Sequence, residues 1–248
     1  MSSILLSRKI GVVIATVLII ALVTLLGVKP AFACGSGGDC LSPHAYAAQE
    51  NNSTTQYGLY FAAYYGQEDF SSDWANNATD EWSFTNKEEW EAFPATSQGG
   101  QWIEAGATNG YKDGGYWAGH FVAYQECQPS CTYQEYLYGS EYPTGVHNYE
   151  IQYIGSNYWR TYVDGNTVED FYFPYTSSSN QFVGIEGDDP ASSFTYDTKA
   201  EGIEYKDQNG VWQHWQTAVN DDQGPLTNWS SAFSYDPSTG TNEIDFYN

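Results

Sequence analysis

The chain has 248 residues, of which 41% are hydrophobic and 17% aromatic, and its formal net charge is −23. Residues 1–33 hold no Asp or Glu, so the remainder, 34–248, sets 31 acidic residues against five basic ones. Such a surface repels phosphate backbones and anionic lipid, which excludes a nucleic-acid-binding protein and a basic membrane-binding face. The high aromatic content, with only 16% charged residues, also excludes an intrinsically disordered chain.

The N-terminal segment has the pattern of a secretory signal peptide. Arg8 and Lys9 precede an uncharged run over 10–28, and the small residues Ala31 and Ala33 follow. A basic start, an apolar run and small residues at positions −3 and −1 predict cleavage after Ala33. We therefore expect a secreted, extracellular protein without membrane attachment after cleavage. The alternative is an anchor by an uncleaved N-terminal helix, because this run is just long enough to span a bilayer.

The chain has four cysteines, Cys34, Cys40, Cys127 and Cys131. In an oxidising compartment four cysteines allow three pairings, and the sequence does not choose among them. We favour the two local pairs, 34–40 and 127–131. A metal site is the competing interpretation, but the four histidines are scattered along the sequence.

After a flexible lead-in over 34–55, the sequence predicts one β domain over 56–248. Short aromatic-rich segments alternate with Gly, Asn and Asp turns, and Asp164-Gly165 is a strong hairpin signal. The expected strands are 57–65, 101–106, 116–125, 149–154, 158–163, 167–173, 181–186, 202–205, 211–215 and 243–247.

Helix is expected at one place only, over 86–92. There Thr85 and Glu88 have the spacing of a capping box, and Pro94 follows the segment. Many short Tyr- and Trp-rich strands with little helix predict an all-β fold, an antiparallel sandwich or barrel. We expect a monomer.

Two of the predicted strands share one design. Side chains alternate across a strand, so Trp102, Glu104 and Gly106 share one face. In 181–186, Glu186 shares a face with Phe182 and with Gly184. The aliphatic residues of both strands lie on the opposite face, and each glycine leaves room beside a carboxylate for the backbone of a ligand.

If these strands lie near each other, Glu104 and Glu186 form a coupled carboxylate pair. One proton is then held more tightly than usual and the other is lost more easily, so one group acts as acid and its partner as base. The simpler interpretation is that both are ordinary glutamates on a solvated sheet.

The segment 101–106 (Gln-Trp-Ile-Glu-Ala-Gly) resembles the strand of neprosin-type glutamic peptidases that carries their first catalytic glutamate. In the related fungal and bacterial glutamic peptidases (eqolisins) a glutamine takes the place of Glu104. The segment 182–187 (Phe-Val-Gly-Ile-Glu-Gly) is similar to the one that holds the second catalytic glutamate, here Glu186. The chain departs from neprosins at Ala107, where they usually have Trp, and at Gly184-Ile185, where they have Gly-Gly.

This resemblance implies a jelly-roll, concanavalin-like sandwich and an acid-active glutamic endopeptidase that needs no metal or other cofactor. Glu104 and Glu186 are then the catalytic pair, and the substrate is a polypeptide. Candidate substrate-binding residues are Trp102, Gly106, Trp117, Tyr124 and Gly184.

The main alternative is a secreted carbohydrate-binding or glycan-hydrolysing β-sandwich, since Tyr and Trp side chains stack on sugar rings and two carboxyl groups can cleave a glycosidic bond. Its partner would be a polysaccharide. A catalytically inactive relative of the peptidases fits the same pattern. A third interpretation is an exported structural protein whose acidic loops at Asp188-Asp189 and Asp221-Asp222 bind calcium.

Overall fold

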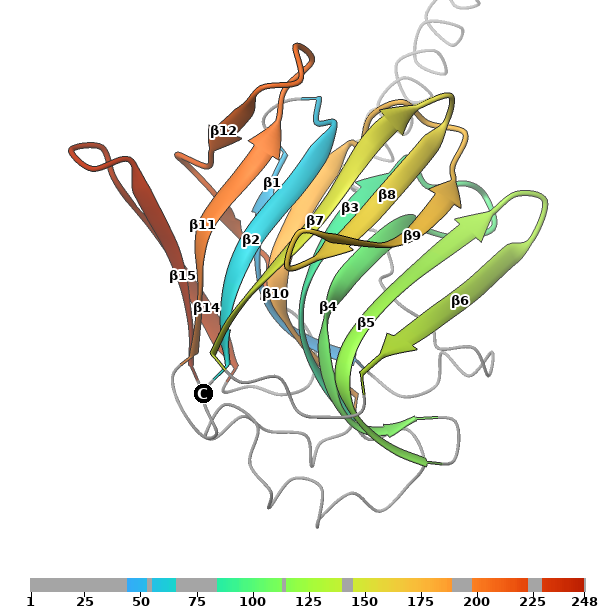
Figure 1. Ribbon diagram of the computed structural model, residues 1–248, viewed down its shortest axis with the longest axis horizontal. Helices are drawn as coiled ribbons and strands as arrows, with labels where there is room; N and C mark the ends of the chain where they lie inside the picture. Colours follow the sequence, from blue (N-terminus) through green and yellow to red (C-terminus); the bar gives the residue numbers. More distant parts are fainter. Residues whose placement is uncertain are drawn as a thin grey trace, which may run out of the picture. The chain divides into compact units, whose positions relative to one another are not determined.

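A computed structural model describes residues 44–52, 55–65, 84–112, 115–139, 145–188, 198–222 and 229–247. Within these ranges the chain forms strands, turns and irregular segments and contains no helix. The strands form two antiparallel sheets that pack face to face as a β-sandwich (Figure 1). The all-β sandwich expected from the turn and aromatic pattern is therefore confirmed.

The first sheet has seven strands in the order β13-β1-β10-β3-β4-β5-β6. Their bounds are β13 Val219–Asn220, β1 His44–Asn51, β10 Asn180–Asp188, β3 Phe84–Phe93, β4 Gln101–Lys112, β5 Gly115–Cys127 and β6 Cys131–Tyr138.

The second sheet has eight strands. Seven follow the order β14-β15-β11-β2-β7-β8-β9, and β12 pairs with β11 beside this path. Their bounds are β14 Ser230–Asp236, β15 Thr241–Tyr247, β11 Thr198–Lys206, β2 Gly58–Tyr65, β7 Gly145–Gly155, β8 Tyr158–Val163, β9 Asn166–Tyr172 and β12 Trp212–His214.

The main hydrophobic core lies between the sheets and follows strand alternation. On β4 the buried residues Ile103, Ala105 and Ala107 face this core, and on β10 Val183 and Ile185 do the same. Leu59, Phe61, Tyr149, Ile151 and Trp159 contribute to it from the second sheet. The alternate side chains of β4 and β10 consequently lie on the outer face of the seven-stranded sheet, which positions the site described below.

The hairpin expected at Asp164-Gly165 is present between β8 and β9. Both residues have positive φ, 51° and 72°, as a two-residue type I′ turn requires. The turn residue Asp164 donates its backbone N–H to the Asn148 carbonyl on β7 and accepts the Asn148 N–H on Oδ1. This turn is therefore fixed to the neighbouring strand as well as to its own hairpin.

The helix expected over 86–92 is wrong. These residues belong to β3, which lies between β10 and β4 and pairs with both along its length. Lys, Glu and Ala favour a helix in isolation, but pairing on both sides satisfies the backbone hydrogen bonds and overrides that propensity. The Thr85 to Glu88 spacing consequently caps no helix.

The flexible lead-in expected over 34–55 is wrong in its second half. His44–Asn51 is β1, which pairs with β10 from His44↔Asp188 to Asn51↔Gln181. The small Ala47 and Ala48 let β1 lie against Gly184, where an added Cβ would come within 2.7 Å of the Ala48 Cβ. The sequence of β1 is rich in Ala and lacks β-branched residues, which is why it gave no strand signal.

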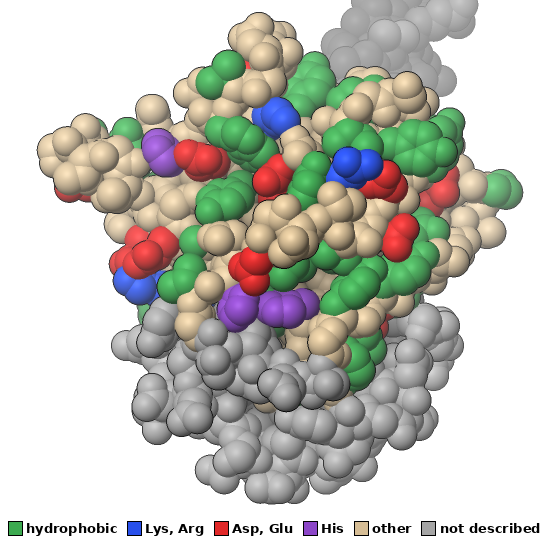
Figure 2. Space-filling model, viewed as in Figure 1, with side chains coloured by type: hydrophobic (Ala, Val, Ile, Leu, Met, Phe, Trp, Pro, Cys, Tyr) green, Lys and Arg blue, Asp and Glu red, His purple; other side chains and the backbone are tan. Residues whose placement is uncertain are grey.

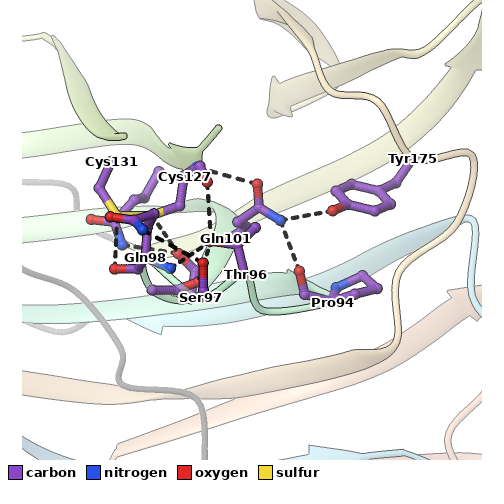
Figure 3. Close-up of a disulfide and its surroundings, with 11 residues drawn as sticks. Pro94, Thr96, Ser97, Gln98, Gln101, Cys127, Cys131 and Tyr175 are labelled. Carbon is purple, nitrogen blue, oxygen red and sulfur yellow. Dashed lines mark hydrogen bonds between the residues drawn. A yellow bond between two sulfur atoms is a disulfide. The ribbon is translucent and has the colours of Figure 1, made fainter. Parts of the chain in front are cut away.

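Cys127 and Cys131 form a disulfide that closes the β5–β6 hairpin, as the local pairing predicts. Gln101 holds this hairpin to the rest of the domain (Figure 3). Its Oε1 accepts the Cys127 backbone N–H, and its Nε2 donates to the Pro94 carbonyl and to the Tyr175 hydroxyl. The start of β4 is thereby linked to three other segments.

The predicted signal peptide over 1–33 and the second cysteine pair, Cys34 and Cys40, lie outside the described residues. In the part of the chain that the structure describes, no helix is long and apolar enough to cross a membrane.

Candidate active site

The two glutamates singled out from the sequence lie close together on the outer face of the seven-stranded sheet. Glu104 is on β4 and Glu186 on β10, and β3 runs between these strands. Carboxylate oxygens of the two residues lie within 4.8 Å of each other. Both side chains are buried, at 2% and 1% exposure. The strand register explains the meeting, because Glu104 faces Trp90 of β3 and Glu186 faces Asn86 of the same strand.

A third carboxylate, Glu88, completes the cluster and was missed from the sequence. Glu88 lies on β3 between Gly106 of β4 and Gly184 of β10, and its carboxylate is within the same 4.8 Å limit of both other glutamates. It is fully buried. Reading 84–93 as a strand would have found it, because alternation places Asn86, Glu88 and Trp90 on one face. We refer to Glu88, Glu104 and Glu186 as the carboxylate cluster.

Side chains of β1 and β3 orient the carboxylate cluster through hydrogen bonds. The Trp90 indole Nε1 donates to Glu104 Oε2 at 2.9 Å, and the Tyr46 hydroxyl donates to Glu186 Oε1 at 2.9 Å. The Asn86 amide donates to Glu88 Oε2 at 3.1 Å and to Glu186 Oε2 at 3.3 Å. Donors to a carboxylate favour its ionised form, so Glu186, which accepts from two of these side chains, is well placed to carry a negative charge.

Two tyrosines beside the cluster keep their protons. Burial, with smaller contributions from the charges of Glu186, Glu88 and Glu104, raises the pKa of Tyr46 well above its usual value. Burial likewise raises the pKa of Tyr133, with Glu135 and the cluster carboxylates adding to the effect. Both phenols are therefore hydrogen-bond donors throughout the pH range in which the glutamates titrate.

Gly106 and Gly184, which the sequence assigned to substrate binding, make room for other parts of the chain and not for a ligand. An added Cβ at Gly106 would lie 2.2 Å from the Lys87 carbonyl oxygen and 2.6 Å from the Glu88 Cβ. At Gly184 it would meet the Ala48 Cβ at 2.7 Å. The space that the sequence assigned to a ligand backbone is thus filled by Glu88 and by β1. These glycines allow the third carboxylate to lie between the other two.

The three aromatic residues proposed as cleft walls have different positions. Trp102 shares the outer face with Glu104, but it is 1% exposed and packs with Trp90 and Phe182 in a second hydrophobic cluster. Trp117 is half-buried on β5, where it pairs with Gly110, six residues along the strand from the partner of Glu104, Ala123.

The prediction that Tyr124 binds substrate beside Glu104 is wrong, because Tyr124 lies on the opposite face of the sheet from Glu104. It pairs with Ile103 and packs against Phe171, with ring centroids 4.9 Å apart, at the core between the sheets. Strand alternation is the reason, since Ala123, the neighbour of Tyr124, is the residue that faces Glu104.

A small hollow opens beside the carboxylate cluster. It is lined by Tyr46, Ala48, Trp90, Phe182 and Asp221. Tyr46 and Trp90 are the donors to Glu186 and Glu104, so the hollow lies directly against side chains that hold the cluster. The neighbouring Asp222 has a structural part, because its Oδ1 accepts the Ala48 N–H and the Ser231 hydroxyl and so ties β1 to β14.

The other face of β3 also carries carboxyl groups, within the core between the sheets. Glu89 and Glu91 are fully buried there. Burial raises the pKa of Glu91 to about 8, even though Ser178 and Gln181 donate hydrogen bonds to it. Burial and the nearby charges of Glu91 and Glu150 raise the pKa of Glu89 well above its usual value. Both groups are consequently protonated in acid.

Two groups of side chains among the described residues have donor atoms close enough to hold a metal ion. One is the carboxylate cluster, and the other consists of His120, His147 and Asp164, again with donor atoms within 4.8 Å of one another. The second group brings together two of the four histidines that look scattered in the sequence.

No protein-family model matches the chain, and no curated protein matches it. The fold is shared with scytalido-glutamic peptidase, solved with a transition-state analog inhibitor: the TM-score is 0.51, with 11% identity over 81% of this chain and 97% of that one. A tripeptide complex of SCP-B, a member of the eqolisin family of peptidases, has a TM-score of 0.49, with 10% identity over 82% of this chain and 98% of that one. A family 16 endo-glucanase from Bacteroides ovatus gives 0.37, with 10% identity over 82% of this chain and 77% of that one.

Proposed function

We propose that this protein is an acid-active glutamic endopeptidase and that the carboxylate cluster is its reaction centre. The observation that carries the proposal is the convergence of Glu104 and Glu186, 82 positions apart in the sequence, within 4.8 Å on one face. Three carboxylates this close cannot all be ionised at modest cost, so the cluster retains protons and offers both an acid and a base. The fold shared with scytalido-glutamic peptidase supports the same function.

In this proposal Glu186 is the base and Glu104 the acid. Glu186, held ionised by Tyr46 and Asn86, removes a proton from a water molecule as the water oxygen attacks the scissile carbonyl carbon. Protonated Glu104 donates a hydrogen bond to the oxygen that becomes negative. The C–N bond then breaks, the amine leaves with a proton from the cluster, and the second product is a carboxylic acid. The charge of Glu88, whose carboxylate lies within 4.8 Å, favours the protonated form of Glu104.

Access to the cluster sets a condition on this mechanism. Glu104 and Glu186 are 2% and 1% exposed, and Trp90 and Trp102 pack beside them. A peptide therefore reaches the carboxyl groups only when their cover opens, and the hollow beside Tyr46 and Trp90 is the place from which opening would start.

The test is hydrolysis of an unfolded protein such as casein at about pH 3–4, with Glu104→Gln and Glu186→Gln compared with the parent chain. Glu186→Gln removes the base, so we expect kcat to fall at least about 100-fold. Glu104→Gln keeps a hydrogen-bond donor for the oxyanion but cannot transfer a proton, so we expect a smaller loss of kcat. Glu201→Gln, an exposed glutamate of the other sheet that pairs with Lys199, is the matched control and should leave kcat unchanged. A chelator should have no effect on hydrolysis.

Two outcomes would contradict the proposal. One is a folded parent protein that cleaves no unfolded substrate between about pH 2 and pH 7. The other is equal activity in the parent and both glutamine variants. Parallel assays on polysaccharides cover the alternative of a glycan-cleaving sandwich, for which the sugar and not the polypeptide would be the substrate.

We also propose that the chain is exported and that its leader is removed after Ala33. The basic, apolar and small-residue pattern of 1–33 supports export. The Cys127–Cys131 disulfide supports it independently, since such bonds persist in oxidising compartments.

A further inference from the structure

We propose that His120, His147 and Asp164 form a binding site for a divalent metal ion of the zinc class that joins the two sheets. His120 is on β5 of the seven-stranded sheet, whereas His147 is on β7 of the eight-stranded sheet, and Asp164 is in the turn that follows β8. Donor atoms from the three residues lie within 4.8 Å of one another. The site is separate from the carboxylate cluster, and the proposal does not rest on the peptidase function.

The two imidazole rings are already in contact. Their centroids are 4.8 Å apart with an interplanar angle of 63°. Donor atoms 2.0–2.1 Å from a tetrahedral zinc ion are about 3.4 Å apart, so rotations about side-chain bonds bring the three donors to binding distance. Rearrangement of the backbone is unnecessary, because the three residues already converge.

Each ring is oriented by an oxygen-bearing neighbour. His120 Nδ1 forms a hydrogen bond with the Tyr149 hydroxyl at 2.7 Å, and His147 Nδ1 lies 2.9 Å from Asp164 Oδ2. Metal-binding histidines commonly have such a partner on one ring nitrogen and bind the ion through the other, which leaves the second ring nitrogen of His120 for the ion. At His147 the partner is the proposed ligand Asp164, so the ion would take the place of the proton between these two groups. Asp164 is itself held in place, because its Oδ1 accepts the Asn148 backbone N–H at 2.9 Å.

The site can be reached by an ion from solvent. The His147 side chain is 19% exposed and the Asp164 side chain 40% exposed. Figure 2 shows histidine side chains side by side at the surface, next to an acidic side chain. A net charge of −23 also attracts cations to the protein in general.

The donor set selects the class of ion. Two imidazole nitrogens and one carboxylate suit zinc, copper or nickel, whereas calcium and magnesium require oxygen donors. Three protein donors leave a coordination position for water. An ion held from both sheets would stabilise the sandwich, because only the folded chain brings the three donors together.

The test is calorimetric titration of the chelator-treated full chain with zinc chloride at neutral pH. We expect one ion per chain. His120→Gln, His147→Gln and Asp164→Asn should each weaken binding by about 10–100-fold. The matched control is His214→Gln, because His214 also lies beside a carboxylate, 3.1 Å from Glu204, but belongs to neither group of metal-binding donors among the described residues. This control should bind zinc as the parent does.

A second measurement keeps the test decisive if a variant fails to fold. At a zinc concentration about 100 times Kd, the melting temperature of the parent protein should rise by about 5–10 °C. Calcium at the same concentration should give no comparable rise. The proposal is overturned if the parent binds no zinc below about 1 mM, or if His214→Gln weakens binding as much as His147→Gln does.

Discussion

At the scale of single residues, the proposed reaction centre depends on a few donors that reach the carboxylate cluster from other strands. Tyr46 is the clearest of these, because its hydroxyl ends on Glu186 and its ring packs at 6.1 Å against Trp90, the donor to Glu104. One residue on β1 thus binds Glu186 directly and contacts the side chain that binds Glu104. It acts through these groups and is a positioning residue.

Tyr46→Phe removes the donor and keeps the ring. Without the hydrogen bond the ionised form of Glu186 is less favoured, so its pKa rises and the acid limb of the kcat profile moves to higher pH. We expect a loss of about 1–3 kcal/mol in unfolding free energy as well. A pH–rate profile and denaturant titration measure the two effects.

The matched control for this variant is Tyr60→Phe. The Tyr60 hydroxyl donates to Asn148 Oδ1 at 2.9 Å on the other sheet, remote from the cluster in strand order. Tyr60→Phe should leave the acid limb of the pH–kcat profile unchanged. A Tyr46→Phe profile that coincides with that of the parent would show that Glu186 does not need this donor.

The residues of the site could be predicted only in part from the sequence. Glu104 and Glu186 were found because each shares a strand face with an aromatic residue and a glycine, with aliphatic residues on the opposite face. Glu88 was missed because its neighbours favour a helix, and the pairing that forces them into β3 comes from strands distant in the sequence. His120 and His147 were treated as scattered for the same reason: only the packing of two sheets brings them together.

At the scale of elements, β3 shows how far context overrides propensity. Its outer face carries Asn86, Glu88 and Trp90, while its inner face carries Lys87, Glu89 and Glu91 between the sheets. The Lys87 ammonium donates a hydrogen bond across the sandwich to the Thr198 hydroxyl of β11. The aromatic and turn pattern predicted every strand of the second sheet except β14, but a strand built of charged residues gives no such signal.

The inner face of β3 makes the stability of the fold depend on pH. Folded Glu91 has a pKa of about 8, above its ordinary value of 4.5, so between these values the folded chain holds a proton that the unfolded chain releases. The stabilisation is complete below about pH 4.5 and is lost as the pH rises towards 8. The unfolding free energy should therefore fall by about 1.4 kcal/mol per pH unit for this group. Glu89 changes in the same direction.

Urea titrations of the parent protein and of Glu91→Gln at several pH values measure this effect. The glutamine cannot ionise, so its curve should be flatter between about pH 5 and pH 8. Glu201→Gln serves as the control, because Lys199 lowers the pKa of that exposed carboxyl and the substitution should leave the slope at neutral pH unchanged. Equal slopes in the parent and in Glu91→Gln would mean that Glu91 is ionised in the folded chain.

At the scale of the whole molecule, one prediction concerns what is released from the cell. If the leader is removed after Ala33, the mature chain begins at Cys34. Intact-mass analysis and N-terminal sequencing of protein from the culture medium check this directly. Lys9→Glu removes charge from the start of the leader and should reduce export. Protein that stays in the membrane fraction with residues 1–33 attached would favour the anchored alternative.

The carboxyl groups inside the sandwich have a practical consequence for anyone who prepares this protein. Near pH 7–8, the usual range in purification, most of the stabilisation that protonated Glu91 gives in acid is lost, and the raised pKa of Glu89 acts in the same direction. Material handled there could lose its structure before any substrate is added, and a negative assay would then report damaged protein. Extraction and storage in mildly acidic buffer would keep the protein folded. A negative assay would then mean that the protein lacks the activity and not that it has unfolded.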